Sequence, residues 1–93
     1  RCSEKLFFTF LSNELRYPLQ AKEVGVKGTV VVQFVVDEKG VISQIEVVRD
    51  IGAGCGRESI RVINKMPEWI PGKQRGKPVK VRMRLPIKFK LLN

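Results

Sequence analysis

The fold is decided by residues 28–36, which read GTVVVQFVV. β-Branched and aromatic residues fill this run, and they favour a strand over a helix. Because apolar side chains occur at both odd and even positions, much of both faces is expected to be buried. The run therefore predicts the central strand of a sheet.

A hairpin is expected to lead from this strand into a second one. Residues 37–40 (DEKG) supply the turn, in which Gly40 can adopt the positive φ that many hairpins need. The second strand is predicted from Val41 to Arg49. Ile42 is out of phase with the other apolar residues of that strand, which predicts a β-bulge near Ser43.

The end of the chain predicts a third strand, from Pro78 to Leu92, in which apolar and basic residues alternate. The apolar set that is expected to face inward comprises Val79, Val81, Met83, Leu85, Ile87, Phe89 and Leu91. The set that is expected to face outward comprises Lys80, Arg82, Arg84, Pro86, Lys88 and Lys90. A proline within a strand is tolerated mainly where no neighbour needs its missing N–H, so Pro86 indicates that this strand lies at an edge.

Three helical segments accompany these strands. The first is predicted within Glu4 to Arg16, and the second covers Leu19 to Val24. The third follows the glycine-rich loop at residues 52–56, shows apolar residues at helical spacing, and stops at Pro67.

Together these elements predict an α+β fold with a β-β-α-β core that is preceded by short N-terminal helices. The simplest arrangement is a three-stranded antiparallel sheet of order 2-1-3, in which the first strand is central and the helices pack on one face. The third strand then keeps one free edge.

The composition argues against catalysis. The chain has no histidine, so it lacks the commonest general base and the histidine-containing zinc sites. Its nine carboxylates are scattered along the sequence and form no acid–base pair. Two cysteines, Cys2 and Cys55, leave open one disulfide or a reactive thiol at Cys55. We therefore expect a protein that is not an enzyme and that has no metal site and no cofactor.

The free edge of the third strand is the first candidate site. An extended peptide can add to such an edge through main-chain hydrogen bonds. In an antiparallel ladder, the N–H and C=O groups of one residue point to the same side. If Pro86 faces the free side, the groups offered there belong to Lys80, Arg82, Arg84 and Lys88. The alternative is an unused edge whose charges prevent aggregation.

The excess of positive charge raises a second possibility. Eighteen Lys and Arg residues against nine Asp and Glu residues give a net charge of +9, which favours anionic partners. Eight of these cations lie between Lys73 and Lys90 with no acid among them, and they could grip phosphates. Because the outward face of the third strand carries no aromatic residue for base stacking, nucleic-acid binding is the weaker alternative, and we expect no nucleic-acid partner.

Aromatic, proline and glycine residues form a pattern over Tyr17 to Leu92 that resembles the TonB C-terminal domain family. Its most specific part is P-x-W-x-P-G-x-x-x-G-x-P-V, at residues 67–79. The residues that carry the resemblance are Tyr17, Pro18, Gly28, Gly40, Pro67, Trp69, Pro71, Gly72, Gly76, Pro78 and Pro86. The resemblance divides the chain into an N-terminal helical extension, residues 1–16, and a TonB-like domain, residues 17–93.

The resemblance implies a periplasmic domain of an inner-membrane-anchored protein. Such domains capture the TonB box, a short segment of an outer-membrane transporter, as an added strand. They transmit energy from the proton gradient across the inner membrane for nutrient uptake. An inner-membrane proton-channel complex is the expected second partner, contacted through an N-terminal part outside these 93 residues.

In this family the capturing edge is the last strand, here Lys77 to Leu92. Leu19, Gln20 and Lys22 are similar in position to residues that lie near the captured peptide. The same edge could pair two copies of the chain, so a homodimer is a further expectation. The alternative reading of the resemblance is a TonB-like envelope domain that is fused to a membrane sensor or a peptidase.

Overall fold

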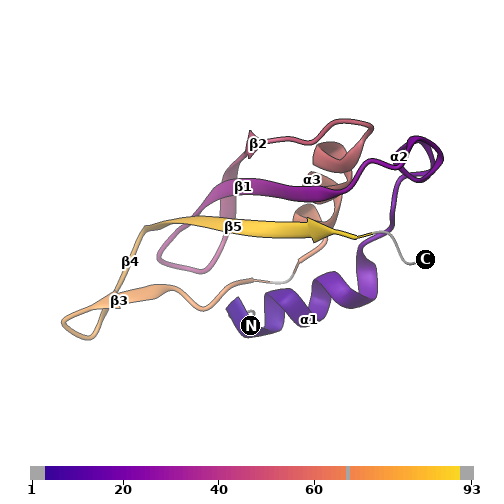
Figure 1. Cartoon of the computed structure of the whole chain (residues 1–93). Helices are drawn as coiled ribbons and strands as arrows, with labels where there is room; N and C mark the ends of the chain where they lie inside the picture. Colours follow the sequence, from indigo (N-terminus) through magenta and orange to yellow (C-terminus); the bar gives the residue numbers. More distant parts are fainter. Residues whose placement is uncertain (1–3, 67, 91–93) are drawn as a thin grey trace.

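β1 (Gly28–Val36) is the centre of the sheet in the computed structural model, which describes residues 4–66 and 68–90. It pairs antiparallel with β2 (Ile42–Arg49) on one side and with β5 (Val81–Phe89) on the other. Figure 1 shows the resulting three-stranded sheet, of order β2-β1-β5. The α+β fold and the strand order predicted from the sequence are confirmed.

Three helices accompany the sheet: α1 (Glu4–Glu14), α2 (Leu19–Val24) and α3 (Cys55–Asn64). The bounds of α2 agree with the prediction, and Gly25 ends this helix with a φ of 74°. α3 ends at Asn64, before the proline that was expected to stop it. Pro67 itself lies outside the described residues, as does Leu92 at the predicted end of the last strand.

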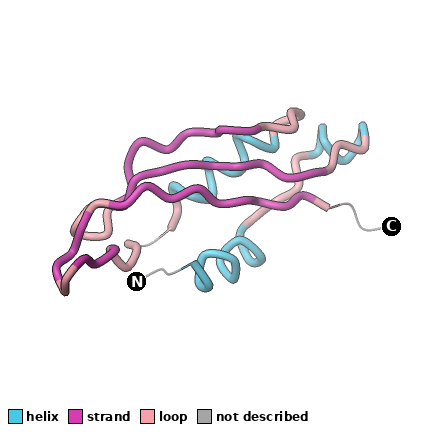
Figure 2. Tube along the Cα trace, turned by 60° about the vertical axis from the view of Figure 1, so that its left-hand side comes forward, coloured by secondary structure: helices cyan, strands magenta, loops and turns pink. Residues whose placement is uncertain are grey.

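One hydrophobic core joins α1 and α3 to the same face of the sheet. Alternate residues of β1, from Val30 to Val36, point into this core and are almost fully buried. On the opposite face of β1, Val35 is buried, whereas Val31 and Gln33 are only half-buried. The expectation of burial on both faces therefore holds fully for one face and partly for the other. The two views agree that α1 lies beyond β5, on the side away from β1 (Figures 1 and 2).

The β1–β2 ladder contains the predicted bulge. The pairs Gln33↔Glu46 and Val35↔Ser43 are two residues apart on β1 but three apart on β2. Gln44, within this stretch, has a φ of 53°, which few residues other than glycine adopt. The extra residue resets the phase of β2, so that the apolar residues on both sides of the bulge pack against the core.

The last strand is shorter than predicted. It is interrupted at Lys80, and the residues before it form β4 (Lys77–Val79). β4 pairs with β3 (Gly72–Gln74) in a separate hairpin. The physical reason is the length of the central strand: β1 ends at Val36, opposite Val81, so earlier residues find no partner there.

The turn of this β3–β4 hairpin explains Gly76, one of the residues that carry the family resemblance. Arg75 and Gly76 are the two residues between the strands, and their φ angles are 52° and 78°. Two successive positive φ angles are typical of a type I′ turn, whose twist suits a hairpin. Figure 1 shows the hairpin projecting beyond the end of the main sheet.

Gly40 and Trp69, two other signature residues, form one contact. The backbone N–H of Trp69 donates to the Gly40 carbonyl oxygen over 2.9 Å. Gly40 has a φ of 85°, and a Cβ atom there would run into the Trp69 carbonyl. This close approach seats the indole ring in the core, with its centre 5.4 Å from the Phe34 ring and 5.7 Å from the Phe7 ring of α1.

Candidate partner-binding edge

β5 offers a regular, unpaired edge. Its nine residues pair with β1 from Gly28↔Phe89 to Val36↔Val81 without a register shift. Within residues 4–66 and 68–90, no further strand pairs with its other side. A strand in this state presents a row of free N–H and C=O groups to an incoming chain.

Pro86 indicates which backbone groups face the free side. It lies opposite Val31 in an unbroken ladder, although it has no N–H to donate. We infer that it occupies a position where both backbone groups point away from β1, so that Arg82, Arg84 and Lys88, which share its parity, point the same way.

The four predicted edge residues have different surroundings. Arg82, Arg84 and Lys88 lie in β5 and are exposed. Lys80 lies between β4 and β5, in neither strand. Arg84 is held across the sheet, where its Nε and Nη2 atoms donate to Gln33 Oε1 over 3.3 and 2.9 Å.

The charge of Lys80 affects the pKa of Asp37, in the hairpin turn between β1 and β2. The Asp37 side chain accepts hydrogen bonds from the N–H groups of Val41, at 2.9 Å, and Lys39, at 2.8 Å. The hydrogen bond from Val41 is the main cause that lowers the pKa of Asp37, and the charges of Lys39 and Lys80 lower it further.

A groove runs between α1 and β5. It has a volume of about 460 Å³ and is mostly apolar. Its lining residues are Phe8, Leu11, Ser12 and Leu15 of the helical segment and Pro86, Ile87 and Lys88 of the strand. The sequence did not lead us to predict this groove. The available signal was that the helix has more apolar residues than its docking needs: Phe7 is fully buried, whereas Phe8 remains 40% exposed.

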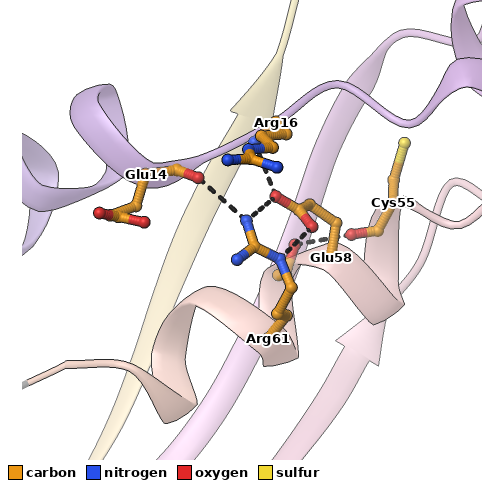
Figure 3. A network of polar contacts seen from close by, with 6 residues as sticks. Glu14, Arg16, Cys55, Glu58 and Arg61 are labelled. Atoms are coloured by element: carbon orange, nitrogen blue, oxygen red, sulfur yellow. Dashed lines mark hydrogen bonds and ion pairs between the residues drawn. The ribbon is translucent and has the colours of Figure 1, made fainter.

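A polar network ties the end of α1 to α3 (Figure 3). Arg61 of α3 donates from Nη2 to the Glu14 carbonyl oxygen at 3.0 Å and to Glu58 Oε2 at 2.6 Å. Glu58 Oε2 also accepts the backbone N–H of Arg16 at 2.7 Å. The network therefore caps the C-terminal end of α1 with a cation and fixes the chain just after it.

Both members of the ion pair are shifted toward their charged forms. The hydrogen bond from Arg61 is the main cause that lowers the pKa of Glu58, and it raises the pKa of Arg61 in turn. The side chain of Glu58 is only 12% exposed. A partly buried pair of this kind is screened less by salt than a surface pair.

The residues after the Tyr-Pro pair lie elsewhere. The Tyr17 hydroxyl donates to the Val26 carbonyl oxygen, and its ring packs edge-on against Phe89 at 5.5 Å. Burial raises the pKa of Tyr17. Leu19 and Gln20 line a hollow beside the start of α3. Together with the exposed Lys22, they are not brought into the groove between α1 and β5.

Comparison with known proteins gives the family. The family model described as "Gram-negative bacterial TonB protein C-terminal" matches residues 13–91. The chain belongs to this family. No curated protein sequence matches the chain.

Two solved structures resemble this TonB-type domain. Both are NMR solution structures of the Helicobacter pylori TonB C-terminal domain. The one that comprises residues 179–285 of that protein is 25% identical, with a TM-score of 0.68, and the match covers 94% of this chain and 78% of that one. The one that comprises residues 194–285 is 28% identical, with a TM-score of 0.59, and the match covers 96% of each chain.

The loop before α3 shows how the TonB-type domain starts this helix without an N-cap side chain. Asp50 Oδ1 accepts the N–H groups of Gly52, at 2.9 Å, and Gly56, at 3.2 Å. Cys55 is a free thiol that is fully buried, and burial, followed by the charge of Asp50, raises its pKa. Burial and the raised pKa both disfavour the alternative of a reactive thiolate at Cys55. Cys2 lies outside the described residues.

The described part of the chain contains neither a metal-binding cluster nor a membrane-spanning helix. Among residues 4–66 and 68–90, no group of Cys, Asp and Glu side chains is arranged to hold a metal ion. Over the same residues, no helix has both the length and the apolar character needed to cross a membrane.

Proposed function

We propose that this TonB-type domain is not an enzyme and binds the TonB box of an outer-membrane transporter along β5, by strand addition. The observation that supports the proposal is the regular edge of β5, which has nine residues in register with β1 and no strand on its other side in the described parts of the chain. Main-chain hydrogen bonds of about 0.5–1.5 kcal/mol each would then supply much of the affinity.

The wider role proposed here follows the family. The domain would lie in the periplasm as part of an inner-membrane-anchored protein and would transmit energy from the proton gradient for nutrient uptake. The inner-membrane proton-channel complex would be reached through another part of that protein. Family membership supports these proposals. The edge of β5 is the part of this chain that would bind the transporter.

A peptide titration tests the site. A TonB-box peptide from a transporter of the same organism is added to the isotope-labelled chain, and amide shifts are recorded. We expect the largest shifts along β5, at Arg82, Arg84 and Lys88. Shifts that cluster at α2 or β2 and spare β5 would contradict the assignment of the site.

A pair of variants separates the backbone contribution from the charge. Arg84→Pro removes one N–H of the free edge and places ring atoms toward the guest, while no backbone hydrogen bond to β1 should be lost because Pro86 already occupies an equivalent position. The side-chain hydrogen bonds of Arg84 to Gln33 are lost equally in the control variant. We expect peptide affinity to fall about tenfold or more. Arg84→Ala, the control, keeps the N–H and should weaken binding much less. Equal losses in the two variants would argue against strand addition.

A second copy of the chain is the competing occupant of the edge. Sedimentation at several concentrations, with and without peptide, distinguishes the two. We expect that any dimer formed through β5 is dissociated by the peptide. A dimer that persists with the peptide bound would place self-association on another surface.

A further inference from the structure

We infer that α1 forms the second wall of the acceptor site and that the site selects an extended segment whose residues alternate between apolar and acidic. The inference rests on the proposed function, because it assumes that a strand adds at β5. It adds to that function a requirement on the side chains of the guest. The occupant is a peptide segment with apolar residues toward α1 and carboxylates toward the opposite face of the sheet.

The apolar half of the requirement follows from the pleat of the sheet. Side chains of an added strand alternate between the two faces, in step with those of β5. On the helix-bearing face, they would lie beside Ile87 and enter the groove of about 460 Å³ that Phe8, Leu11 and Leu15 line. An apolar side chain placed there loses contact with water, whereas a charged one would be desolvated without a partner.

α1 keeps apolar surface exposed beside the groove, in addition to the residues that pack in the core. α1 is docked through Phe7 and Leu11, which are 0% and 7% exposed. Phe8 lies outside the buried core cluster and is 40% exposed, yet its ring is positioned edge-on against Phe7, with 5.3 Å between the ring centres. A guest side chain would therefore meet a surface that is already in place.

The position of the wall is fixed at its C-terminal end. Arg61 reaches the Glu14 carbonyl oxygen at 3.0 Å, and Glu58 holds the Arg16 N–H at 2.7 Å. Leu15, which lines the groove, lies between these two anchoring points. Such preorganisation lowers the entropy that binding has to offset.

The acidic half of the requirement follows from charge. On the face away from the helices, the exposed side chains of β5 are Arg82, Arg84, Pro86 and Lys88, with no acid among them. Arg84 is held in place by two hydrogen bonds to Gln33, at 3.3 and 2.9 Å. Guest residues that alternate with the apolar ones would point to this face, where carboxylates pair best with the cations.

Three capped synthetic peptides of seven residues test both halves. The first has valine at its second, fourth and sixth positions and glutamate elsewhere. The second has the same composition but places the three valines together at one end. The third replaces each glutamate of the first with glutamine. Affinities are measured by calorimetry at low salt, with the site mapped by amide shifts.

We expect the alternating peptide to bind at β5 about tenfold more tightly than its composition-matched counterpart, because only the alternating one directs every valine to the groove. We expect the glutamine peptide to bind several-fold more weakly than the alternating one at low salt and to lose the salt dependence. Equal affinity of the alternating and rearranged peptides would overturn the apolar half, and equal affinity of the glutamate and glutamine peptides would overturn the acidic half.

A matched pair of α1 variants locates the wall. Ser12→Trp fills the groove, whereas Asn13→Trp adds the same ring to an exposed position of α1 that does not line it. We expect the first to weaken the alternating peptide about tenfold and the second to leave it nearly unchanged, with amide spectra showing that both variants fold. Identical affinities of the two variants, with the loss in Arg84→Pro retained, would reject the wall while preserving strand addition. A failure of all peptides to perturb β5 would instead reject the proposed function.

Discussion

The two outer strands of the sheet, β2 and β5, flank the same central strand and differ in almost everything that matters for adding another. β2 has two register shifts against β1 and a positive φ at Gln44, whereas β5 has nine pairs in register. A bulge twists an edge and interrupts its row of donors and acceptors, which protects it from unplanned pairing. β5 has no such bulge. Its cations and its proline discourage unplanned pairing instead, and its regular backbone can still accept another strand.

The surroundings of the two edges differ as well. β5 has α1 beside it, with an apolar groove between them. At β2, the hollow that includes Ile42 and Ile45 is formed with the end of α3 and the segment after it. A regular ladder and the apolar groove beside α1 therefore occur together at the β5 edge only, and the following variants test that difference.

The largest effect is expected from removing the anchor of the helix that only β5 has beside it. Phe7→Ala deletes a fully buried ring that contacts Trp69, and we expect a loss of about 3–4 kcal/mol in the free energy of unfolding. Phe8→Ala, the control, should cost about 1 kcal/mol or less. Urea unfolding with amide exchange of α1 measures both. Equal losses would show that α1 is not docked through Phe7.

The next effect concerns the turn that sets up the β2 edge. Gly40→Ala has to tolerate a φ of 85° and a clash with the Trp69 carbonyl. Gly25→Ala, the control, has a similar φ of 74° but open space around the new methyl group. We expect about 1 kcal/mol of destabilisation for the control and roughly 2–3 kcal/mol for Gly40→Ala, as read from thermal or urea unfolding. Similar values would mean that the contact between Gly40 and Trp69 does not constrain the hairpin.

A smaller effect is expected when acid weakens the network that fixes α1 beside β5. The pKa of Glu58 is lower in the folded chain than in the unfolded one, so the unfolded state binds the proton more readily. The stabilisation is full above about pH 4.3, the ordinary value for glutamate, and is lost as the pH falls through the lower folded-state pKa.

Glu58→Gln isolates this contribution from that of other carboxylates such as Asp37. At neutral pH, the wild-type chain should be about 1 kcal/mol more stable than Glu58→Gln. The difference should vanish at the acid end of the titration, as followed by urea unfolding at a series of pH values. A gap that stays constant with pH would exclude a role for the charge of Glu58.

The smallest effect sharpens the meaning of the cations on β5. Arg84→Ala removes an exposed side chain whose two hydrogen bonds to Gln33 are solvent-accessible. We expect no more than about 0.5 kcal/mol of destabilisation. Glu46→Ala on β2, also exposed and paired with Gln33 across the other ladder, gives the matching measurement at the opposite edge. A loss well above this value would indicate that Arg84 serves the fold rather than the free edge.

The main sheet could be predicted from the sequence because its signals are local. The run at residues 28–36, the glycine in the next turn and the alternation that ends at Phe89 each describe a single element, and Pro86 alone indicates which strand is at the edge. The phase of Ile42 even reveals the bulge, since side-chain parity is a property of the strand itself.

The missed features depend on distances between elements. The β3–β4 hairpin exists because β1 ends opposite Val81, which no local pattern in residues 72–79 records. The groove requires that α1 lie beside β5, and its C-terminal anchor joins Glu14 to Arg61 across 47 positions of sequence. The division of the chain at residues 16 and 17 stays a prediction, with Phe7 and Leu11 of the first segment contributing to the common core.

The in-register ladder between β1 and β5 has a mechanical consequence. When a strand is pulled along its own axis, all the rungs of a ladder share the load, whereas a pull at right angles breaks them one after another from the end. A chain zipped onto β5 would continue a ladder that is nine rungs long without a break. The force needed to detach the added strand would then depend on the direction of the pull more than on equilibrium affinity. A contact that dissociates readily without load would still hold when the force acts along the strand.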